Sequence, residues 1–477
     1  MRLPHAFHLV TLVAVTASAP LAAQSRSTSN LVSIPIERMT LPNGLEVILS
    51  PDPRVPQVVV DVWYHVGSKN DVPGRTGFAH LFEHVMFTGS GHIPYGIHDR
   101  LTTGVGGSNG GSTSNDRTNY YEVVPSNYLE SALWLESDRM GFLLDELDEA
   151  KFKGQRAIVQ TERQQRTDNV PYGRWLEILS HVTYPESHPY SLPVVGYTSD
   201  LEKAGVDDVR EFFRAYYAPS NATIAIVGEF EPAQAKGWVT KYFGDLKRGP
   251  AILRPKVEGW TLPAEKHFVY EDRVQLPRLY LAWPAVGDDD DDVWPLQFLS
   301  RILVGSRTAR LTKTMVYDLQ RATSVGGFQG AYETTGTFYV DVTPRPGHSL
   351  DEVEATADSI IARFKQEGPT GEEMARASAT REFEFIATLE SNRGKAEALN
   401  DGFVFHGDAA RFKRDDAKIK AVTAADVKRV ANRYLGAGRV VLSIVPLGKG
   451  DQAAKAAKSI SVKVAPDGSH YILGDKH

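Results

Sequence analysis

The segment Phe78-Ala-His-Leu-Phe-Glu-His-Val-Met-Phe87 combines a helical pattern with three polar side chains among apolar ones. In an α-helix each residue advances about 100°, so His80 and His84 project from one face on neighbouring turns. Two imidazole nitrogens placed in this way match the reach of one tetrahedral zinc ion. Glu83 lies beside His84, where its carboxylate can take a proton from a water molecule that the ion activates. The segment therefore predicts a metal-binding helix with an adjacent general base.

A catalytic zinc site also needs a third protein ligand and an open coordination position. The chain contains no cysteine, so that ligand must be a histidine, an aspartate or a glutamate. Glu162 is a candidate, at the end of the segment Gln155-Arg-Ala-Ile-Val-Gln-Thr-Glu162. Its helical face also carries Ile158 and Val159, and an acid beside two apolar side chains is unusual unless it is paired. Spacing alone nevertheless favours an exposed glutamate on a charged helix, and so leaves the third ligand open.

Length and charge restrict the class of protein to which the chain can belong. Its 477 residues exceed one ordinary domain and predict two domains. The net charge of -6 gives no basic surface for nucleic acid and no polybasic patch for an anionic membrane. Without cysteine the chain forms no disulfide, so its stability must come from core packing and a bound metal.

The first residues are typical of a secretory signal peptide. Arg2 is followed by a mostly apolar run from Phe7 to Ala19, and Ala22-Ala23 offers small residues for cleavage. The run is short for a membrane span, which favours a signal peptide over residues 1–24 and export to the periplasm or the extracellular space. An uncleaved membrane anchor is the alternative. No later stretch is long and apolar enough to cross a bilayer, so we expect no span in the mature chain.

A weak internal repeat indicates two related halves. The helical segment Asp208–Tyr217 precedes a strand-like run, and Asp426–Leu435, 218 positions later, does the same. An offset of 216 places Leu296, Leu299 and Ser300 at the positions of His80, Glu83 and His84. These residue types do not form a metal site, so only the first half is predicted to bind metal.

Hairpin patterns and paired amphipathic helices, without a regular alternation of strand and helix, favour an α+β fold. A Pro-containing stretch separates the halves and reads as a linker. We predict a zinc-bearing N-terminal domain over residues 33–249, a linker over 250–266, a zinc-free homologous domain over 267–450 and a polar tail over 451–477.

Five consecutive aspartates, Asp288 to Asp292, form the strongest local charge run. The run lacks the spaced ligands and the turn glycine of calcium-binding loops, which favours a solvated loop over a calcium site.

Together with its surroundings, His80-Leu-Phe-Glu-His84 resembles the zinc motif of the pitrilysin/insulinase family of inverzincin metallopeptidases, which includes the mitochondrial processing peptidases. Glu162 follows His84 after 77 intervening residues, close to the separation usual in that family. The resemblance runs from about residue 35 to 445, and its further matching segments are Gly74–Ala79, Met86–Ser90, Asp116–Tyr121, Pro171–Arg174, His188–Ser191, Tyr216–Asn221 and Ile226–Gly228.

The resemblance implies two homologous α/β-roll domains, each a layered antiparallel sheet with helices, with the zinc site in the first. It implies one Zn²⁺ per chain, bound by His80, His84 and Glu162, with Glu83 as the general base. By this resemblance Glu162 is the third ligand that spacing alone did not assign.

The glycine-rich stretch Gly104–Ser114 is not followed by Gly-Lys-Ser/Thr, so it is not a phosphate-binding loop. In the family the equivalent segment is an edge strand that pairs with an extended substrate, a mode that recognises backbone. This implies that Asn109, Gly110, Gly111 and Ser112 bind substrate. Gly110 and Gly111 stand where family members usually have Asn-Ala, so the amide of that asparagine is missing here.

Two further positions depart from the family pattern. Gln155 stands where many members have a second glutamate, and a glutamine cannot take a proton. Val316 and Thr323 stand where the family has an arginine and a tyrosine that reach substrate, while Arg321 and Tyr317 lie nearby in other registers. These departures motivate the hypothesis that a homologous zinc-free partner subunit supplies the arginine and the tyrosine.

The sequence thus predicts an exported zinc-dependent peptidase that hydrolyses extended peptides or unfolded segments. One alternative is a catalytically silent subunit that retains zinc and acts in binding or assembly within a heterodimeric peptidase. Another is a lyase or a non-peptidase hydrolase with the same metal triad.

Overall fold

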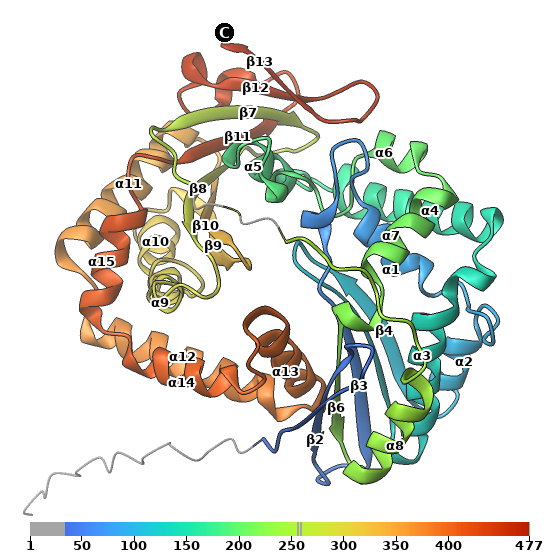
Figure 1. The fold of residues 1–477 in the computed structure, drawn as a ribbon. Coiled ribbons are helices and arrows are strands. Elements are labelled where there is room, and N and C mark those ends of the chain that lie inside the picture. The colour runs from blue at the N-terminus through green and yellow to red at the C-terminus, as the bar shows by residue number, and fades with distance from the viewer. Residues whose placement is uncertain (1–33, 255–256, 258–259, 477) are drawn as a thin grey trace, which may run out of the picture. The chain divides into compact units, whose positions relative to one another are not determined.

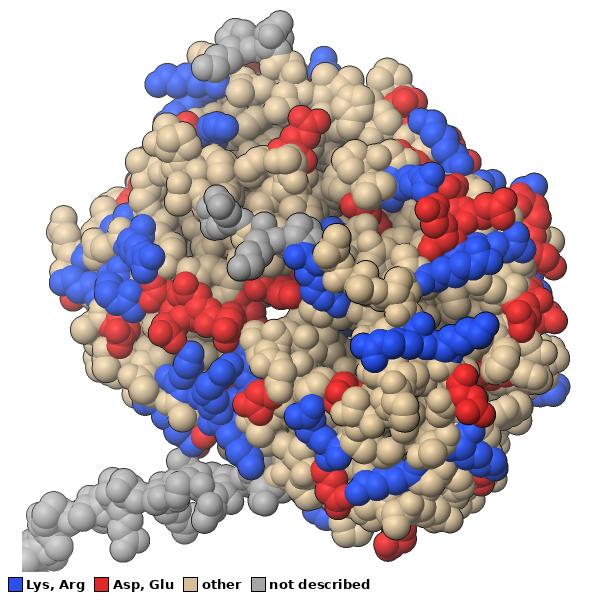
Figure 2. All heavy atoms as spheres, in the orientation of Figure 1, with Lys and Arg blue, Asp and Glu red and all other residues tan. Residues whose placement is uncertain are grey.

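The computed structural model describes residues 34–254, 257 and 260–476 (Figure 1). The predicted signal peptide, residues 1–24, lies outside the described residues. Within the described part of the chain, none of the helices combines the length and hydropathy needed to cross a bilayer. On the face drawn in Figure 2, lysine and arginine side chains are interspersed with aspartate and glutamate.

The first half forms a six-stranded sheet with the order β1-β2-β6-β3-β5-β4. Its strands are β1 (Glu37–Thr40), β2 (Glu46–Pro51), β3 (Gln57–Tyr64), β4 (Ser108–Thr113), β5 (Thr118–Pro125) and β6 (Ala222–Gly228). β2 and β6 are parallel, and the other neighbouring strands are antiparallel. The apolar strands β2, β3 and β6 are buried on both faces, which explains their central positions, while the glycine-rich β4 lies at the edge.

The second half forms a seven-stranded sheet with the order β13-β12-β7-β11-β8-β10-β9. Its strands are β7 (Lys266–Asp272), β8 (Arg278–Val286), β9 (Ala322–Ala331), β10 (Thr335–Pro344), β11 (Val440–Pro446), β12 (Ile460–Val464) and β13 (Tyr471–Lys476). The segment predicted as a polar tail therefore contains two strands that extend this sheet. They are held there because Val462 and Tyr471 are buried in an apolar cluster with Phe268 of β7.

Helices flank both sheets (Figure 1). Those of the first half are α1 (Phe78–Val85), α2 (Ile97–Thr103), α3 (Leu129–Glu146), α4 (Glu149–Arg163), α5 (Trp175–Thr183), α6 (Thr198–Lys203), α7 (Val206–Tyr216) and α8 (Pro232–Phe243). Those of the second half are α9 (Val293–Leu303), α10 (Arg310–Thr312), α11 (Leu350–Glu367), α12 (Gly371–Glu390), α13 (Asn392–His406), α14 (Arg411–Ala421) and α15 (Ala424–Tyr434).

The two sheets repeat one topology, which confirms the predicted α+β fold of two homologous halves. The order β2-β6-β3-β5-β4 corresponds strand for strand to β7-β11-β8-β10-β9. α7 leads into β6 as α15 leads into β11. Neither sheet is purely antiparallel, because β2 with β6, β7 with β11 and β12 with β7 are parallel. Parallel neighbours arise here because the early and late strands of each half are joined by long crossovers and not by hairpins.

Each sheet also packs against a helix from the other half. α13 contacts β3 and β6, and its fully buried Asn400 donates a hydrogen bond to the backbone oxygen of Asp61 at 2.9 Å. In return, α5 contacts β8 and β11, and its Ile178 and Leu179 are buried against Tyr280. The second sheet therefore shares an apolar cluster with a helix of the first half, and the contact of α13 with the first sheet includes a buried hydrogen bond.

The aspartate run lies in a loop with exposed central residues, as predicted, and its two ends are bound to two basic helices. Arg411 of α14 pairs with Asp288 at 2.7 Å, and Arg429 of α15 pairs with Asp292 at 2.7 Å. Both partners lie far along the chain, so the run itself carries no sign of them. These cations neutralise the carboxylates at the two ends of the run.

Candidate metal centre

The helix predicted to bind metal is α1, and apolar packing holds it in place. Phe78, Leu81, Phe82 and Val85 are buried in the core of the first half. Its N-cap residue, Gly77, has a φ of 81°, which lies in the left-handed region that favours glycine. The side chains that face away from the core are therefore presented by a fixed helix.

Asp71 holds the beginning of α1. Its carboxylate accepts hydrogen bonds from the backbone N–H of Gly77 at 2.8 Å and of Ala79 at 3.2 Å. It thereby satisfies donors that the first turn of a helix leaves free. The sequence did not identify Asp71, because it precedes the helix by several residues and matches no local capping motif.

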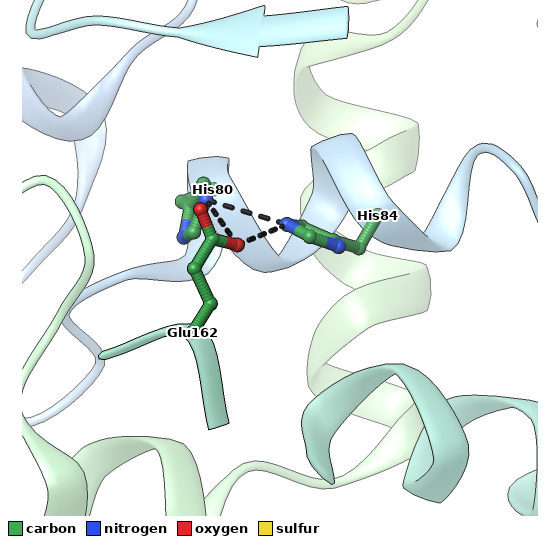
Figure 3. A group of neighbouring side chains, drawn as sticks. All are labelled: His80, His84 and Glu162. Atoms are coloured by element: carbon green, nitrogen blue, oxygen red, sulfur yellow. Dashed lines mark hydrogen bonds and ion pairs between the residues drawn. The ribbon is translucent and has the colours of Figure 1, made fainter. Parts of the chain in front are cut away.

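Figure 3 shows His80, His84 and Glu162 converging on one point. The Nε2 atoms of the two histidines lie 3.3 Å apart. Oε2 of Glu162 lies 3.1 Å from Nε2 of His84 and 3.7 Å from Nε2 of His80. Glu162 reaches them from α4, which packs against α1. The fold thus brings together the three residues that the sequence and the resemblance selected.

The chemistry of these donors fits a divalent metal ion. Burial lowers the pKa of His80 to about 3 and also lowers the pKa of His84, so both imidazoles are uncharged. The two imidazole nitrogens and the carboxylate oxygen lie within 4.8 Å of one another, which is a ligand set that zinc uses in peptidases. Arg166 pairs with the other oxygen of Glu162 at 2.6 Å, leaving Oε2 turned toward the histidines.

The carboxylate of Glu83 lies on the side of α1 that faces β4. Its Oε2 accepts a hydrogen bond from Oγ1 of Thr113 at 2.7 Å. Burial raises the pKa of Glu83 above its ordinary value, which favours uptake of a proton and suits a general base. Thr113 was not singled out from the sequence, because nothing in the spacing of β4 relates it to Glu83.

The predicted substrate-binding residues lie on β4, which among the described strands pairs only with β5. Asn109 donates a hydrogen bond to Asp99 at 2.9 Å, and Ser112 donates one to Asn119 at 2.7 Å. The side chains of Asn109 and Ser112 are thus engaged within the protein, and the residues between them are glycines. What β4 offers a peptide is its free backbone edge, which fits strand addition.

On α4, fewer of the residues predicted to share the inward face with Glu162 are buried than the sequence pattern indicates. Gln155 and Val159 are buried, whereas Ile158 is 46% exposed. Ile158 therefore does not share the inward face, because that face is limited to the residues that meet α1 and the core. Gln155 lies on the same buried face as Val159, seven residues before Glu162.

The described residues contain three further groups of acidic residues with a histidine: His98, Glu122 and Glu136; Glu265, His267 and Glu354; and Asp288, Asp401 and His406. The guanidinium group of an arginine contacts a carboxylate in each of these groups. Arg139 lies 3.3 Å from Glu122, Arg439 lies 2.8 Å from Glu354, and Arg411 lies 2.7 Å from Asp288. Because a cation already bridges these carboxylates, the three groups are ion-pair networks and not metal centres.

Among the described residues of the second half, no equivalent ligand set lies at the corresponding place. α9 packs against α12 as α1 packs against α4. Leu296 and Leu299, the counterparts of His80 and Glu83, are fully buried in the core. Arg301 of α9 pairs with Glu384 of α12 at 2.7 Å, so an ion pair joins these two helices.

The structure also shows where the expected arginine and tyrosine are missing. Val316 packs against the core of the second half, and Thr323 donates a hydrogen bond to a backbone carbonyl of β10 at 3.1 Å. Arg321 is bound to α11, with 3.1 Å to Glu352. Tyr317 is 48% exposed. Arg321 is therefore engaged in an ion pair with α11 and stands in another register than Val316.

Comparison with known proteins places the chain in a family. Residues 46–191 match the model described as insulinase (peptidase family M16), and residues 203–380 match the peptidase M16 inactive domain. The chain belongs to the insulinase family. The match to the inactive-domain model agrees with the absence of metal donors between α9 and α12.

Relatives of this insulinase-family chain include zinc proteases and processing peptidases. It is 27% identical over 89% of its length to the zinc protease PqqE of Helicobacter pylori, 95% of which is covered. It is 24% identical over 88% of its length to a probable mitochondrial-processing peptidase subunit beta of Arabidopsis thaliana, 80% of which is covered.

Solved structures of the insulinase family share the fold. A protease from Helicobacter pylori, 26% identical, superposes with a TM-score of 0.82 over 87% of this chain and 100% of that one. A peptidase M16 inactive domain from Pseudomonas fluorescens, 19% identical, superposes with a TM-score of 0.76 over 86% of this chain and 98% of that one. The second likeness concerns the fold alone.

Proposed function

We propose that this protein is a zinc-dependent peptidase that hydrolyses extended peptides or unfolded segments. The observation that carries the proposal is that His80 Nε2, His84 Nε2 and Glu162 Oε2 lie close together. The two histidines belong to α1, which also bears Glu83. Membership of a peptidase family and similarity to a named zinc protease support zinc as the ion.

Each residue of the site has a defined part in peptide hydrolysis. His80, His84 and Glu162 bind the ion, and Arg166 fixes the orientation of Glu162. Zinc, when bound, supplies Lewis-acid polarisation of the peptide carbonyl and makes water more acidic. Glu83 takes the proton from the attacking water and then delivers it to the nitrogen of the departing amine.

The substrate binds along the free edge of β4 in extended form. Pairing to this edge uses backbone groups of the peptide and places few demands on its side chains. A folded protein cannot present such a strand without local unfolding, so flexible peptides and unfolded segments are the preferred substrates.

The test combines metal analysis with peptide hydrolysis for the wild type and Glu83→Gln. We expect one zinc per chain in both proteins, cleavage of a quenched peptide library by the wild type, and a loss of activity of at least about 100-fold in the variant. Equal activity in both would show that Glu83 is not the base. A zinc-loaded wild type that cleaves no peptide would contradict the proposed peptidase.

A second candidate is a subunit that needs a zinc-free homologue to complete its site. The positions of Val316 and Thr323, and the pairing of Arg321 with α11, favour it. In this case a partner contributes an arginine and a tyrosine to substrate binding, and peptidase activity rises when the purified chain is mixed with that partner. Full activity of a pure monomer would exclude this candidate.

The N-terminal pattern supports export, which we include in the proposal. The mature protein is then periplasmic or secreted and begins near residue 25. N-terminal sequencing of the protein from fractionated cells of the natural host tests this. Recovery of the full chain from the cytosol alone would contradict it.

A further inference from the structure

The carboxylate of Glu83 is held between α1 and the edge strand β4. Its Oε2 accepts the hydrogen bond from Thr113, and among the described residues no other hydrogen bond to this carboxylate is formed. One oxygen is therefore anchored, while Oε1 remains free to receive a proton.

The proton of the Thr113 hydroxyl can be assigned from its neighbours. Oγ1 of Thr113 lies 2.7 Å from Glu83 Oε2, and 3.5 Å from both the backbone oxygen of Ala79 and Oγ1 of Thr118. Thr118 uses its own proton in a hydrogen bond to the backbone oxygen of Val66 at 2.9 Å. The single proton of Thr113 therefore goes to Glu83, the nearest acceptor and the one that can be charged.

Gly111 lies two residues before Thr113 on the same face of β4. Its lack of a side chain determines how much space separates β4 from Glu83. A Cβ atom at this position would lie 3.1 Å from Cγ of Glu83 and 3.3 Å from a ring atom of Phe87. Phe87 is itself packed against Tyr120, with 5.8 Å between the ring centroids. Because Gly111 has no Cβ, β4 can lie close beside Glu83, and the hydroxyl of Thr113 contacts its carboxylate.

We propose that Thr113 is a positioning residue for Glu83: it anchors Oε2 so that Oε1 is presented to the water and then to the leaving amine. The inference rests on the proposed function, in which Glu83 is the base. It also explains why a glycine stands at position 111, because its lack of a side chain lets β4 approach α1 closely enough for this hydrogen bond.

The test compares Thr113→Val, which keeps the shape and removes the hydroxyl, with Thr113→Ser, which keeps the hydroxyl. Thr335→Val is the control, because it removes a buried threonine hydroxyl that donates to a backbone oxygen at 3.2 Å in the second sheet. We expect Thr113→Val to lower kcat by roughly 10- to 100-fold, with KM and zinc content unchanged. Thr113→Ser should restore kcat, and Thr335→Val should leave it unchanged.

A second comparison separates positioning from general damage. In the Glu83→Gln background, Thr113→Val should cause little further loss, because both changes act through one group. Crystal structures of the zinc-loaded wild type and Thr113→Val should show the Glu83 carboxylate rotated in the variant. An unchanged carboxylate, or a wild-type kcat in Thr113→Val, would overturn the inference. If the wild type cleaves no peptide, the proposed function fails, while the crystal structures still decide the positioning.

Discussion

Asn400 of α13 donates a hydrogen bond to the backbone oxygen of Asp61 in β3 at 2.9 Å, and its side-chain nitrogen also lies 3.2 Å from the Asp61 carboxylate. Both residues are fully buried, and burial raises the pKa of Asp61 to about 6. A helix from the second half thus supplies a polar partner to the centre of the first sheet.

Replacing Asn400 should therefore weaken the whole structure. We expect Asn400→Ala to lower the free energy of unfolding by about 2–3 kcal/mol, because it removes a buried hydrogen bond to the backbone oxygen of Asp61 and one of the donors to its carboxylate. Urea denaturation measures the change. Asn432→Ala, at an exposed position on α15, is the control and should change stability by less than about 0.5 kcal/mol. Similar small effects of both variants would refute this role of Asn400.

Loss of the Asp71 carboxylate should loosen the metal-binding helix. Asp71→Ala removes the acceptor for two backbone N–H groups at the start of α1, which should cost about 1–3 kcal/mol of stability. Because His80 lies in the first turn, zinc affinity should fall as well, as measured by competition with a chelator. Asp207→Ala, in the exposed first turn of α7, should alter neither quantity. Unchanged zinc affinity in Asp71→Ala would contradict the prediction.

Acid should weaken the contact between the halves at Glu333. Burial would raise the pKa of Glu333, but hydrogen bonding by His65 and the charge of Lys69 outweigh it and lower the pKa from 4.5 to about 2. An acid whose pKa is lower in the folded than in the unfolded protein stabilises the folded state at a pH above its unfolded-state pKa. This stabilisation is lost as the pH falls from about 4.5 toward 2.

The difference in stability between the wild type and Glu333→Gln should consequently be largest near neutral pH and shrink over that acidic window. Urea midpoints measured from pH 7 down to the lowest pH at which the protein stays soluble give this difference. Glu382→Gln, at an exposed position on α12, should show no such trend. A difference for Glu333→Gln that does not change with pH would argue against the ion pair.

Removal of the metal should lower the melting temperature. A ligand that binds only the folded state at about 100 times its Kd adds about 2.7 kcal/mol of stability. Dialysis against a chelator should remove this stabilisation, and zinc should restore it. In His84→Ala the melting temperature should respond to neither treatment. A wild type that is indifferent to the chelator would contradict the assigned ligand set.

Local periodicity explains why much of the fold was predictable. Apolar runs indicate the strands β2, β3 and β6, and helical spacing indicates α1. The duplication was indicated because the pair α7 and β6 recurs as the pair α15 and β11. The basic partners of the aspartate run and the C-terminal strands were missed. In both cases the stabilising partners, such as Arg411 for Asp288 and Phe268 for Tyr471, lie far away in the sequence.

The sequence by itself paired two of the three residues that converge in the candidate metal site. Positions i and i+4 of a helix must share a face, so His80 and His84 were paired from their spacing, and the resemblance added Glu162. Only the tertiary structure decided what surrounds them: Asp71 at the start of α1, Thr113 on the Glu83 carboxylate, and α13 against the first sheet. These contacts join residues from different elements, and their distances depend on packing, which no local pattern encodes.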